Sequence, residues 1–164
     1  EEVREMLAYY ASVLPFRHSV DELIEVMKPW YGNYCFDNSE CGMATIYNPA
    51  MVLNFVDNYI QSNYEIPKKP CEVIPSTDHE IVRQLIRYAK EFAHDSSIIE
   101  DIMTKGFALG YLLDIFPATS INTPDGILSL LFYLGMVTID GTYQSYTRFV
   151  ITNEAVRKQM QTLI

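Results

Sequence analysis

The side chains best able to do chemistry in this chain are its cysteines, histidines and carboxylates. A structural zinc site needs ligands in closely spaced pairs. Cys35 and Cys41 are separated by five residues with no second pair, and the histidines are scattered at positions 18, 79 and 94. This spacing predicts no metal site.

The motifs that bind phosphates or activate a nucleophile are also missing from the sequence. Neither G-x-x-x-x-G-K-[ST] nor G-x-G-x-x-G occurs. Gly106 and Gly110 stand four residues apart, but no Lys-Ser or Lys-Thr follows them. The G-x-S-x-G elbow of many hydrolases is absent too. We therefore expect no catalytic residue and no cofactor in this chain, and we do not expect it to be an enzyme.

The stretch "YGNYCFDNSECGMATIYNPAMVLNFV", residues 31–56, gathers aromatic and amide side chains and allows two interpretations. In the structural one, Gly32 ends a helix in the left-handed conformation and a short hairpin leads to a helix that begins at Asn48-Pro49. In the other, the stretch is a docking surface for a protein partner, with Trp30 and Tyr31 as anchors. The structural interpretation is preferred, because capping and hairpin formation already account for these residue types. The possible docking residues are Trp30, Tyr31, Gly32, Tyr34, Phe36, Tyr47, Asn48 and Pro49.

Composition and charge limit the kinds of partner. Of 164 residues, 49% are apolar, enough to fill a core, and the net charge is −9. Residues 1–65 hold ten Asp and Glu against three Lys and Arg, so most of the excess lies there. An acidic surface repels phosphate backbones and anionic membranes, which makes nucleic-acid binding unfavourable. No stretch approaches the ~20 apolar residues of a membrane span. Three cysteines, an odd number, fit a reducing cytoplasm better than a disulfide framework.

Apolar spacing and capping signals predict a helical first half. A helix is expected over residues 3–14, ending before Pro15. Ser19 and Glu22 form a capping-box pattern for a second helix, whose last turn Pro29 should bend or end. The third helix begins at Asn48-Pro49, with Leu53 among the residues of its expected apolar face.

A proline-rich segment, residues 66–77, is predicted to be a linker between subdomains 1–65 and 78–164. Past it, Thr77 and Glu80 suggest a capping box for a helix that runs to about residue 92, and a shorter helix ends at Gly106. The following apolar run, residues 107–116, could be a strand.

The segment 123–158 reads as helix, β-hairpin, helix. Thr123 caps the first helix, the hairpin is expected to turn near Asp140-Gly141, and Asn153 caps the last helix. This is the order of the second half of a winged helix. We therefore predict a mainly α, α+β fold: a helical domain with short β-hairpins, ending in a winged-helix-like helix–hairpin–helix unit.

A winged helix raises the question of nucleic-acid binding. A reading helix needs side chains that reach base edges, but "PDGILSLLFYLG" offers only Asp125 and Ser129 as polar groups. Possible wing contacts to phosphate are Arg148 with Tyr143 and Tyr146, although two tyrosines on a hairpin are also typical of cross-strand packing. A nucleic-acid-binding winged-helix module therefore stays the alternative interpretation.

Four motifs in order connect the chain to a known family: "WYGNYCF", "YNPAMVLNFV", "LLFYLGMVTI" and "FVITNEAVRKQM". They resemble the C-terminal portion of the bacterial AAA-ATPase-like proteins that are abundant in Bacteroidetes. Family members read W-Y-x-G/N-Y-x-F, Y-N-P/S-x-x-V-L-x-F, L-x-x-x-G-x-L-T-I and P-N-x-x-V-R in succession. One departure is Thr152, where many relatives carry Pro before the capping Asn.

The resemblance implies a fragment, as does a chain that opens inside a helix pattern without Met. In the family, a P-loop ATPase core lies upstream and a restriction-endonuclease-like nuclease domain often follows. The chain would be a non-catalytic, cytoplasmic accessory module that docks on the ATPase core, with ATP and Mg bound by the parent protein. The isolated fragment is also expected to self-associate, because a docking surface without its partner exposes apolar area.

Overall fold

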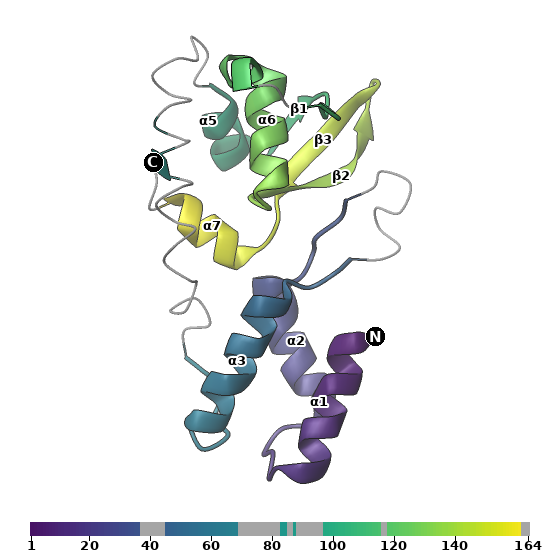
Figure 1. Cartoon of the computed structure of the whole chain (residues 1–164), viewed down its shortest axis with the longest axis vertical. Coiled ribbons are helices and arrows are strands. Elements are labelled where there is room, and N and C mark those ends of the chain that lie inside the picture. Colours follow the sequence, from purple (N-terminus) through teal and green to yellow (C-terminus); the bar gives the residue numbers. More distant parts are fainter. Residues whose placement is uncertain (37–44, 69–82, 85–86, 88–96, 116–117, 162–164) are drawn as a thin grey trace.

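The structure, a computed structural model, describes residues 1–36, 45–68, 83, 84, 87, 97–115 and 118–161. Over these residues, α-helices and one three-stranded antiparallel sheet form a mixed α+β fold. Figure 1 shows helices α1, α2 and α3 at one end of the molecule and the sheet with α5 and α6 at the other. The hydrophobic residues form two clusters, one at each end.

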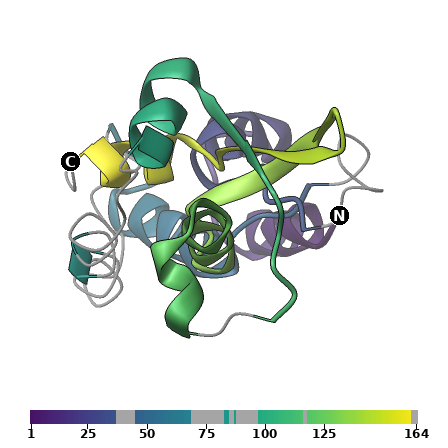
Figure 2. The ribbon, with the colours of Figure 1, turned by 90° about the horizontal axis from the view of Figure 1, so that it is seen from above.

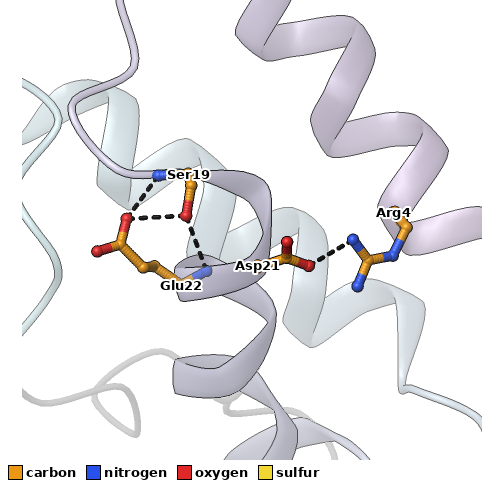
Figure 3. Close-up of polar contacts among 4 residues, drawn as sticks. All are labelled: Arg4, Ser19, Asp21 and Glu22. Carbon is orange, nitrogen blue, oxygen red and sulfur yellow. Dashed lines mark hydrogen bonds and ion pairs between the residues drawn. The ribbon is translucent and has the colours of Figure 1, made fainter.

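Helices α1 (Glu2–Val13) and α2 (Val20–Tyr31) begin and end close to their predicted bounds. The capping box is confirmed: the Ser19 hydroxyl accepts from the Glu22 N–H, and the Glu22 carboxylate accepts from the Ser19 N–H at 2.7 Å. This backbone hydrogen bond lowers the pKa of Glu22 below its usual 4.5. An exposed ion pair between Arg4 and Asp21 joins the two helices (Figure 3).

At the end of α2, one of the two outcomes expected at Pro29 is excluded and the role expected of Gly32 is wrong. The helix does not end at Pro29 but continues to Tyr31, whose side chain is buried in the N-terminal cluster. Gly32 has φ −93°, and Asn33, at φ 70°, takes the left-handed conformation instead. Gly32 is needed for space, because a Cβ there would lie 2.8 Å from the Lys28 carbonyl oxygen.

Helix α3 (Pro49–Gln61) begins as predicted, with the Asn48 side chain accepting from the Met51 N–H at 3.2 Å. Its inward face packs against α1 and α2. Phe55 and Tyr59 are stacked there, and the buried Tyr59 hydroxyl accepts from the backbone N–H groups of Arg17 and His18. Leu53 was expected on this face but is exposed, and Met51 is buried instead.

The second cluster is built on α5 (Ser97–Lys105), a short 3₁₀ helix η1 (Ala118–Asn122) and α6 (Pro124–Tyr133). Helix α5 ends before Gly106, and α6 has the predicted Thr123 cap, which accepts from the Gly126 N–H. Strand β1 (Phe107–Gly110) is shorter than the predicted apolar run. Both views show α6 beside the sheet (Figure 1, Figure 2).

The sheet has the order β1-β3-β2, with β2 spanning Val137–Tyr143 and β3 spanning Tyr146–Ile151. The β2–β3 hairpin does not turn at Asp140-Gly141 as predicted. Those two residues form a bulge, with Gly141 at φ 86°, and the turn lies at Gln144-Ser145, which both have positive φ. A two-residue turn with positive φ at both positions matches the twist of a hairpin. The bulge places Asp140 where its carboxylate pairs with Arg148 across the strands.

Helix α7 (Glu154–Gln161) lies between the two ends of the molecule and contacts both α2 and β3 (Figure 1). Asn153 caps it as predicted, accepting from the Val156 N–H at 3.0 Å. The same side chain donates to the Gly32 carbonyl at 3.1 Å. Ala155 is buried in the N-terminal cluster, so this cluster is completed by a residue from the far end of the chain.

The expectation that the cysteines are reduced is wrong for Cys35, which is disulfide-bonded. The other two cysteines, at positions 41 and 71, lie outside the described residues. The same holds for most of the predicted 66–77 linker and for the Thr77–Glu80 capping box.

Candidate docking site

An apolar hollow of about 150 Å³ opens beside the start of α3. Among the described residues, its lining contains three aromatic rings, a proline ring, one aliphatic side chain and one amide, and no charged side chain. We call this hollow the aromatic pocket; its lining residues are Tyr34, Phe36, Ile46, Tyr47, Asn48 and Pro49.

Hydrogen bonds between different segments of the chain fix the backbone around the aromatic pocket. Tyr34 and Ile46 form an antiparallel bridge through two backbone bonds of 3.2 and 3.0 Å. The Asn48 N–H donates to the Tyr31 carbonyl at 3.0 Å, which fixes the start of α3 against the end of α2. On the other side, the Thr138 hydroxyl accepts from the Cys35 N–H at 2.7 Å and donates to the Cys35 carbonyl at 2.9 Å. This pair joins the pocket segment to strand β2.

The rings of the aromatic pocket continue onto α6. The Tyr34 and Phe36 rings are stacked with centroids 6.2 Å apart, and Phe36 meets the buried Phe132 edge-on at 5.8 Å. Phe132 in turn contacts Tyr133. Phe36 is 56% exposed, Ile46 53% and Tyr133 54%. Exposed apolar side chains that adjoin in this way are typical of a protein-interaction surface.

Polar groups at the aromatic pocket keep hydrogen-bonding capacity. The Asn48 Oδ1 accepts from Met51, so the other side-chain atom is the NH₂ group. Within the described ranges this NH₂ group makes no hydrogen bond, and neither does the Tyr47 hydroxyl. Burial raises the pKa of the Tyr47 hydroxyl above its usual 10.0, and the nearby Glu25 carboxylate raises it further. Two of the residues that line the pocket thus carry donors that have no hydrogen bond within the described ranges.

The structure brings together five of the eight predicted docking residues, Tyr34, Phe36, Tyr47, Asn48 and Pro49, in the aromatic pocket. The other three, Trp30, Tyr31 and Gly32, do not line the pocket.

The predicted anchors both make contacts within the protein: Tyr31 is buried, and Trp30 is partly buried beside α7. Tyr31 is buried against Phe55 with ring centroids 6.0 Å apart. The Lys158 ammonium of α7 lies 4.3 Å from the centroid of the Trp30 ring, a cation–π contact. Gly32 lies under the Tyr47 ring, and a Cβ there would be 3.5 Å from that ring. These residues position the pocket and do not line it.

The three predicted wing residues are brought together, but their charge is already paired. Tyr143 and Tyr146 are partners across the β2–β3 hairpin. The Arg148 guanidinium pairs with Asp140 and lies 5.0 Å from the centroid of the Phe107 ring. The Tyr146 ring packs against Tyr111 with centroids 4.9 Å apart, and the Arg148–Asp140 pair is a contact between the two strands.

The polar groups of α6 are also engaged. The Asp125 carboxylate accepts from the Tyr111 N–H at 2.9 Å, and the Ser129 hydroxyl accepts from the Leu113 N–H at 2.9 Å. They hold the segment after β1 against α6 and are not directed at a ligand. Most other residues of this helix are buried.

Sequence reasoning missed two residues of this region. Ile46, predicted to pack in the hairpin, is half exposed at the pocket, and Tyr133, predicted to lie on a core helix, is also half exposed. Phe132 is buried, as predicted for that helix, but its contact with Phe36 was not foreseen. The separation along the chain, about a hundred residues between Phe36 and Phe132, left no local signal for their contact.

Two searches for other kinds of site concern the described ranges alone. There, no group of three or more His, Cys, Asp or Glu side chains is placed to hold a metal ion. No helix in the same ranges has the length and apolarity needed to cross a membrane.

Comparison with known proteins adds no relative. The chain matches no protein-family model, no curated protein and no solved structure.

Proposed function

We propose that this chain is a non-catalytic accessory module of a bacterial AAA-type ATPase, and that it docks on the ATPase core through the aromatic pocket. The observation that carries the proposal is the pocket itself: its half-exposed Phe36 ring stacks beside the buried Tyr34 ring and contacts Phe132 of α6. We propose the ATPase core as the partner because the four ordered motifs resemble the AAA-ATPase-like family. The parent protein would bind ATP and Mg.

The order of helices and strands in the second half of the chain supports the proposal that this half is a winged-helix-like unit. The order α5, β1, η1, α6, β2, β3, with β3 in the middle of the sheet, is that of a winged-helix-like unit. In such a unit α6 takes the place of the reading helix. Its side chains here are buried or bonded within the protein, so we propose a winged-helix-like scaffold used for protein contact.

The position of the aromatic pocket also suggests how the module acts. The pocket segment is bonded to α2 through Tyr31 and to β2 through Thr138, and α7 is bonded to the end of α2 through Asn153. A partner that binds the pocket therefore contacts a junction of both halves. We propose that docking couples the state of the ATPase core to the orientation of the winged-helix-like unit.

The first test is the coding DNA upstream of Glu1. A strand followed by G-x-x-x-x-G-K-[ST] is expected there. The encoded core, produced separately, should then bind this chain in isothermal titration calorimetry. A start codon with no such loop, or ATP hydrolysis by the isolated chain, would contradict the proposal.

A matched pair of variants tests the surface. Phe36→Ser and Leu53→Ser each replace a half-exposed apolar side chain, but Leu53 lies outside the aromatic pocket. Phe36→Ser should weaken binding to the core by about tenfold or more, the effect of removing an interface anchor, and Leu53→Ser should leave it within about twofold. Equal losses would place the contact elsewhere.

The nucleic-acid-binding alternative predicts a different result. Fluorescence anisotropy with duplex DNA at low salt should show no shift at micromolar protein, because Arg148 is neutralised by Asp140 and the chain has a net charge of −9. Saturable binding in that range would favour the alternative.

A further inference from the structure

The Tyr59 hydroxyl, near the C-terminal end of α3, is approached by three nitrogen atoms of the loop between α1 and α2. The backbone N–H groups of Arg17 and His18 donate to its oxygen at 3.1 and 3.2 Å. The His18 Nδ1 lies 3.0 Å from the same oxygen. Tyr59 is only 1% exposed. Its hydroxyl therefore depends on this loop for hydrogen bonds.

These contacts assign the protons between the two side chains. A tyrosine hydroxyl has one proton to donate, and a neutral imidazole has one donor nitrogen and one acceptor nitrogen. Two N–H groups already point at the Tyr59 oxygen, so its own proton is directed at the His18 Nδ1. A proton on Nδ1 would place three donors on one oxygen and leave the hydroxyl proton without an acceptor in the described residues. The folded protein therefore requires the Nε2–H tautomer of His18.

The same loop packs on the aromatic rings of the N-terminal cluster. The Phe16 ring meets the Tyr59 ring edge-on with centroids 5.1 Å apart, and it lies 5.9 Å from the Tyr64 ring. The His18 ring lies 5.7 Å from the Tyr59 ring. Two side chains of the loop thus rest on Tyr59, and loss of the bond to His18 would loosen the loop against α3.

The surroundings of His18 allow it to take up a proton. The residue is partly exposed, so solvent protons reach it. On α2, the Glu22 carboxyl is near enough for a charge on His18 to lower its pKa, although the hydrogen bond from the Ser19 N–H lowers that pKa more. Arg17 is paired at 3.9 Å with Glu65, which follows α3. A protonated His18 ring would therefore be drawn toward Glu22.

We propose that the His18–Tyr59 contact is an acid-sensitive switch: neutral His18 fastens the α1–α2 loop to α3, and protonation of Nδ1 releases it. A protonated Nδ1 can only donate, and the Tyr59 oxygen already has two donors. The contact needs the neutral ring, so its contribution to stability is present at neutral pH and is lost as the pH falls. Imidazole ordinarily changes its charge between about pH 5 and 8, and this range tests the switch. The inference goes beyond the proposed docking function and does not depend on it.

The first test is the tautomer of His18 in the full chain. Long-range ¹H–¹⁵N NMR correlation at about pH 8 distinguishes the two ring nitrogens of a neutral histidine. The His18→Asn variant assigns the signals among the three histidines. We expect a protonated Nε2 and an unprotonated Nδ1. A proton on Nδ1 at this pH, or averaging between both tautomers, would overturn the proposal.

The second test compares urea unfolding of the wild type and His18→Asn at about pH 8 and pH 5. Asparagine also offers an acceptor to the Tyr59 hydroxyl, but it does not titrate. The folded-to-unfolded ratio of the wild type should fall roughly threefold to tenfold more than that of the variant, the effect of losing one hydrogen bond. Other titrating groups act equally in both proteins, and about 0.5 M salt screens the attraction to Glu22. Equal falls would overturn the switch.

Tyr59→Phe is the control for the partner of His18. Without the hydroxyl, the wild-type His18 and His18→Asn should give the same pH dependence of unfolding. A difference that persists would show that His18 acts through another group, and the assignment to Tyr59 would fail. If Tyr59→Phe does not fold, the tautomer measurement and the comparison with His18→Asn still decide the question.

Discussion

The aromatic pocket and the β2–β3 hairpin both expose aromatic side chains, but they differ in what those side chains leave unsatisfied. At the hairpin, the Tyr146 ring packs against the Tyr111 ring, and the Arg148 charge is paired with Asp140. At the pocket, the rings enclose a hollow, and donors at its edge have no bond within the described residues. Exposure alone therefore does not distinguish a binding surface from a packed one. A hollow that no side chain fills, together with donors that have no partner in the described residues, is the better indication of a binding surface.

The two surfaces also depend on the rest of the molecule to different degrees. The hairpin is formed by residues close in sequence, whereas the aromatic pocket rests on contacts such as Asn153 with Gly32, which are 121 residues apart. Changes far from the pocket in sequence should therefore disturb it and leave the hairpin intact. The following predictions test this difference.

Asn153→Ala should have the largest effect, lowering the free energy of unfolding by about 2–4 kcal/mol. The substitution removes a helix cap and also leaves the Gly32 carbonyl without its donor. Asn48→Ala is the matched control, since the Asn48 side chain caps α3 but makes no second hydrogen bond within the described residues, and should cost only about 1 kcal/mol. Urea unfolding of both variants gives the comparison. Equal losses would mean that the bond to Gly32 contributes nothing.

Gly32→Ala should lower the free energy of unfolding by about 1–3 kcal/mol, the usual cost of overpacking. The new Cβ would meet the Lys28 carbonyl oxygen at 2.8 Å and the Tyr47 ring at 3.5 Å. NMR shifts should therefore change at Tyr47 and stay constant at Tyr143. Ala at this position without loss of stability would show that the end of α2 adjusts freely.

Asp140→Asn should change stability by less than about 1 kcal/mol, because the ion pair with Arg148 is largely exposed. The variant frees the guanidinium at the hairpin. Even so, the anisotropy of labelled duplex DNA should stay unchanged, since the rest of the surface remains acidic. Binding that appears in Asp140→Asn alone would show that this one carboxylate suppresses a nucleic-acid site.

Tyrosine titration should separate the two surfaces with almost no effect on stability. The pKa of Tyr111 is raised above 10.0 chiefly by the neighbouring Tyr146, whereas the pKa of Tyr47 is raised chiefly by burial. Tyr146→Phe should therefore lower the pKa of Tyr111 toward 10.0 and leave that of Tyr47 unchanged. Site-resolved ¹³C NMR between pH 8 and pH 12 measures both. A shift at Tyr47 would show that the two surfaces are coupled.

Much of the local structure could be predicted from the sequence. The caps at Ser19, Asn48, Thr123 and Asn153 all bond to a backbone N–H three residues along the chain. Such contacts depend on a few consecutive residues, so a sequence pattern is enough to find them. The same holds for the mixed α+β class, which follows from where apolar periodicity changes.

The wrong predictions concern residues whose position depends on more than the spacing of residue types in their own segment. Gly32 is a separate case: it has the residue type of a helix end, but its small size is required by the nearby Lys28 carbonyl oxygen and not by its φ. Leu53 has the right spacing for the core yet faces outward. The β2–β3 turn lies at Gln144-Ser145 because a bulge at Gly141 shifts the register. No local pattern carries this information.

At the candidate site, too, the sequence predicted some features and the tertiary structure decided others. The sequence by itself determined which residue types gather at positions 30–49, where the helices begin, and that the chain is acidic. Only the tertiary structure decided that Trp30 and Tyr31 make contacts within the protein while Phe36 and Ile46 are half exposed. The physical reason is that capping acts over a few residues of chain. Burial depends on which surfaces the fold brings together, and here those surfaces include α6 and α7 from the far end of the sequence.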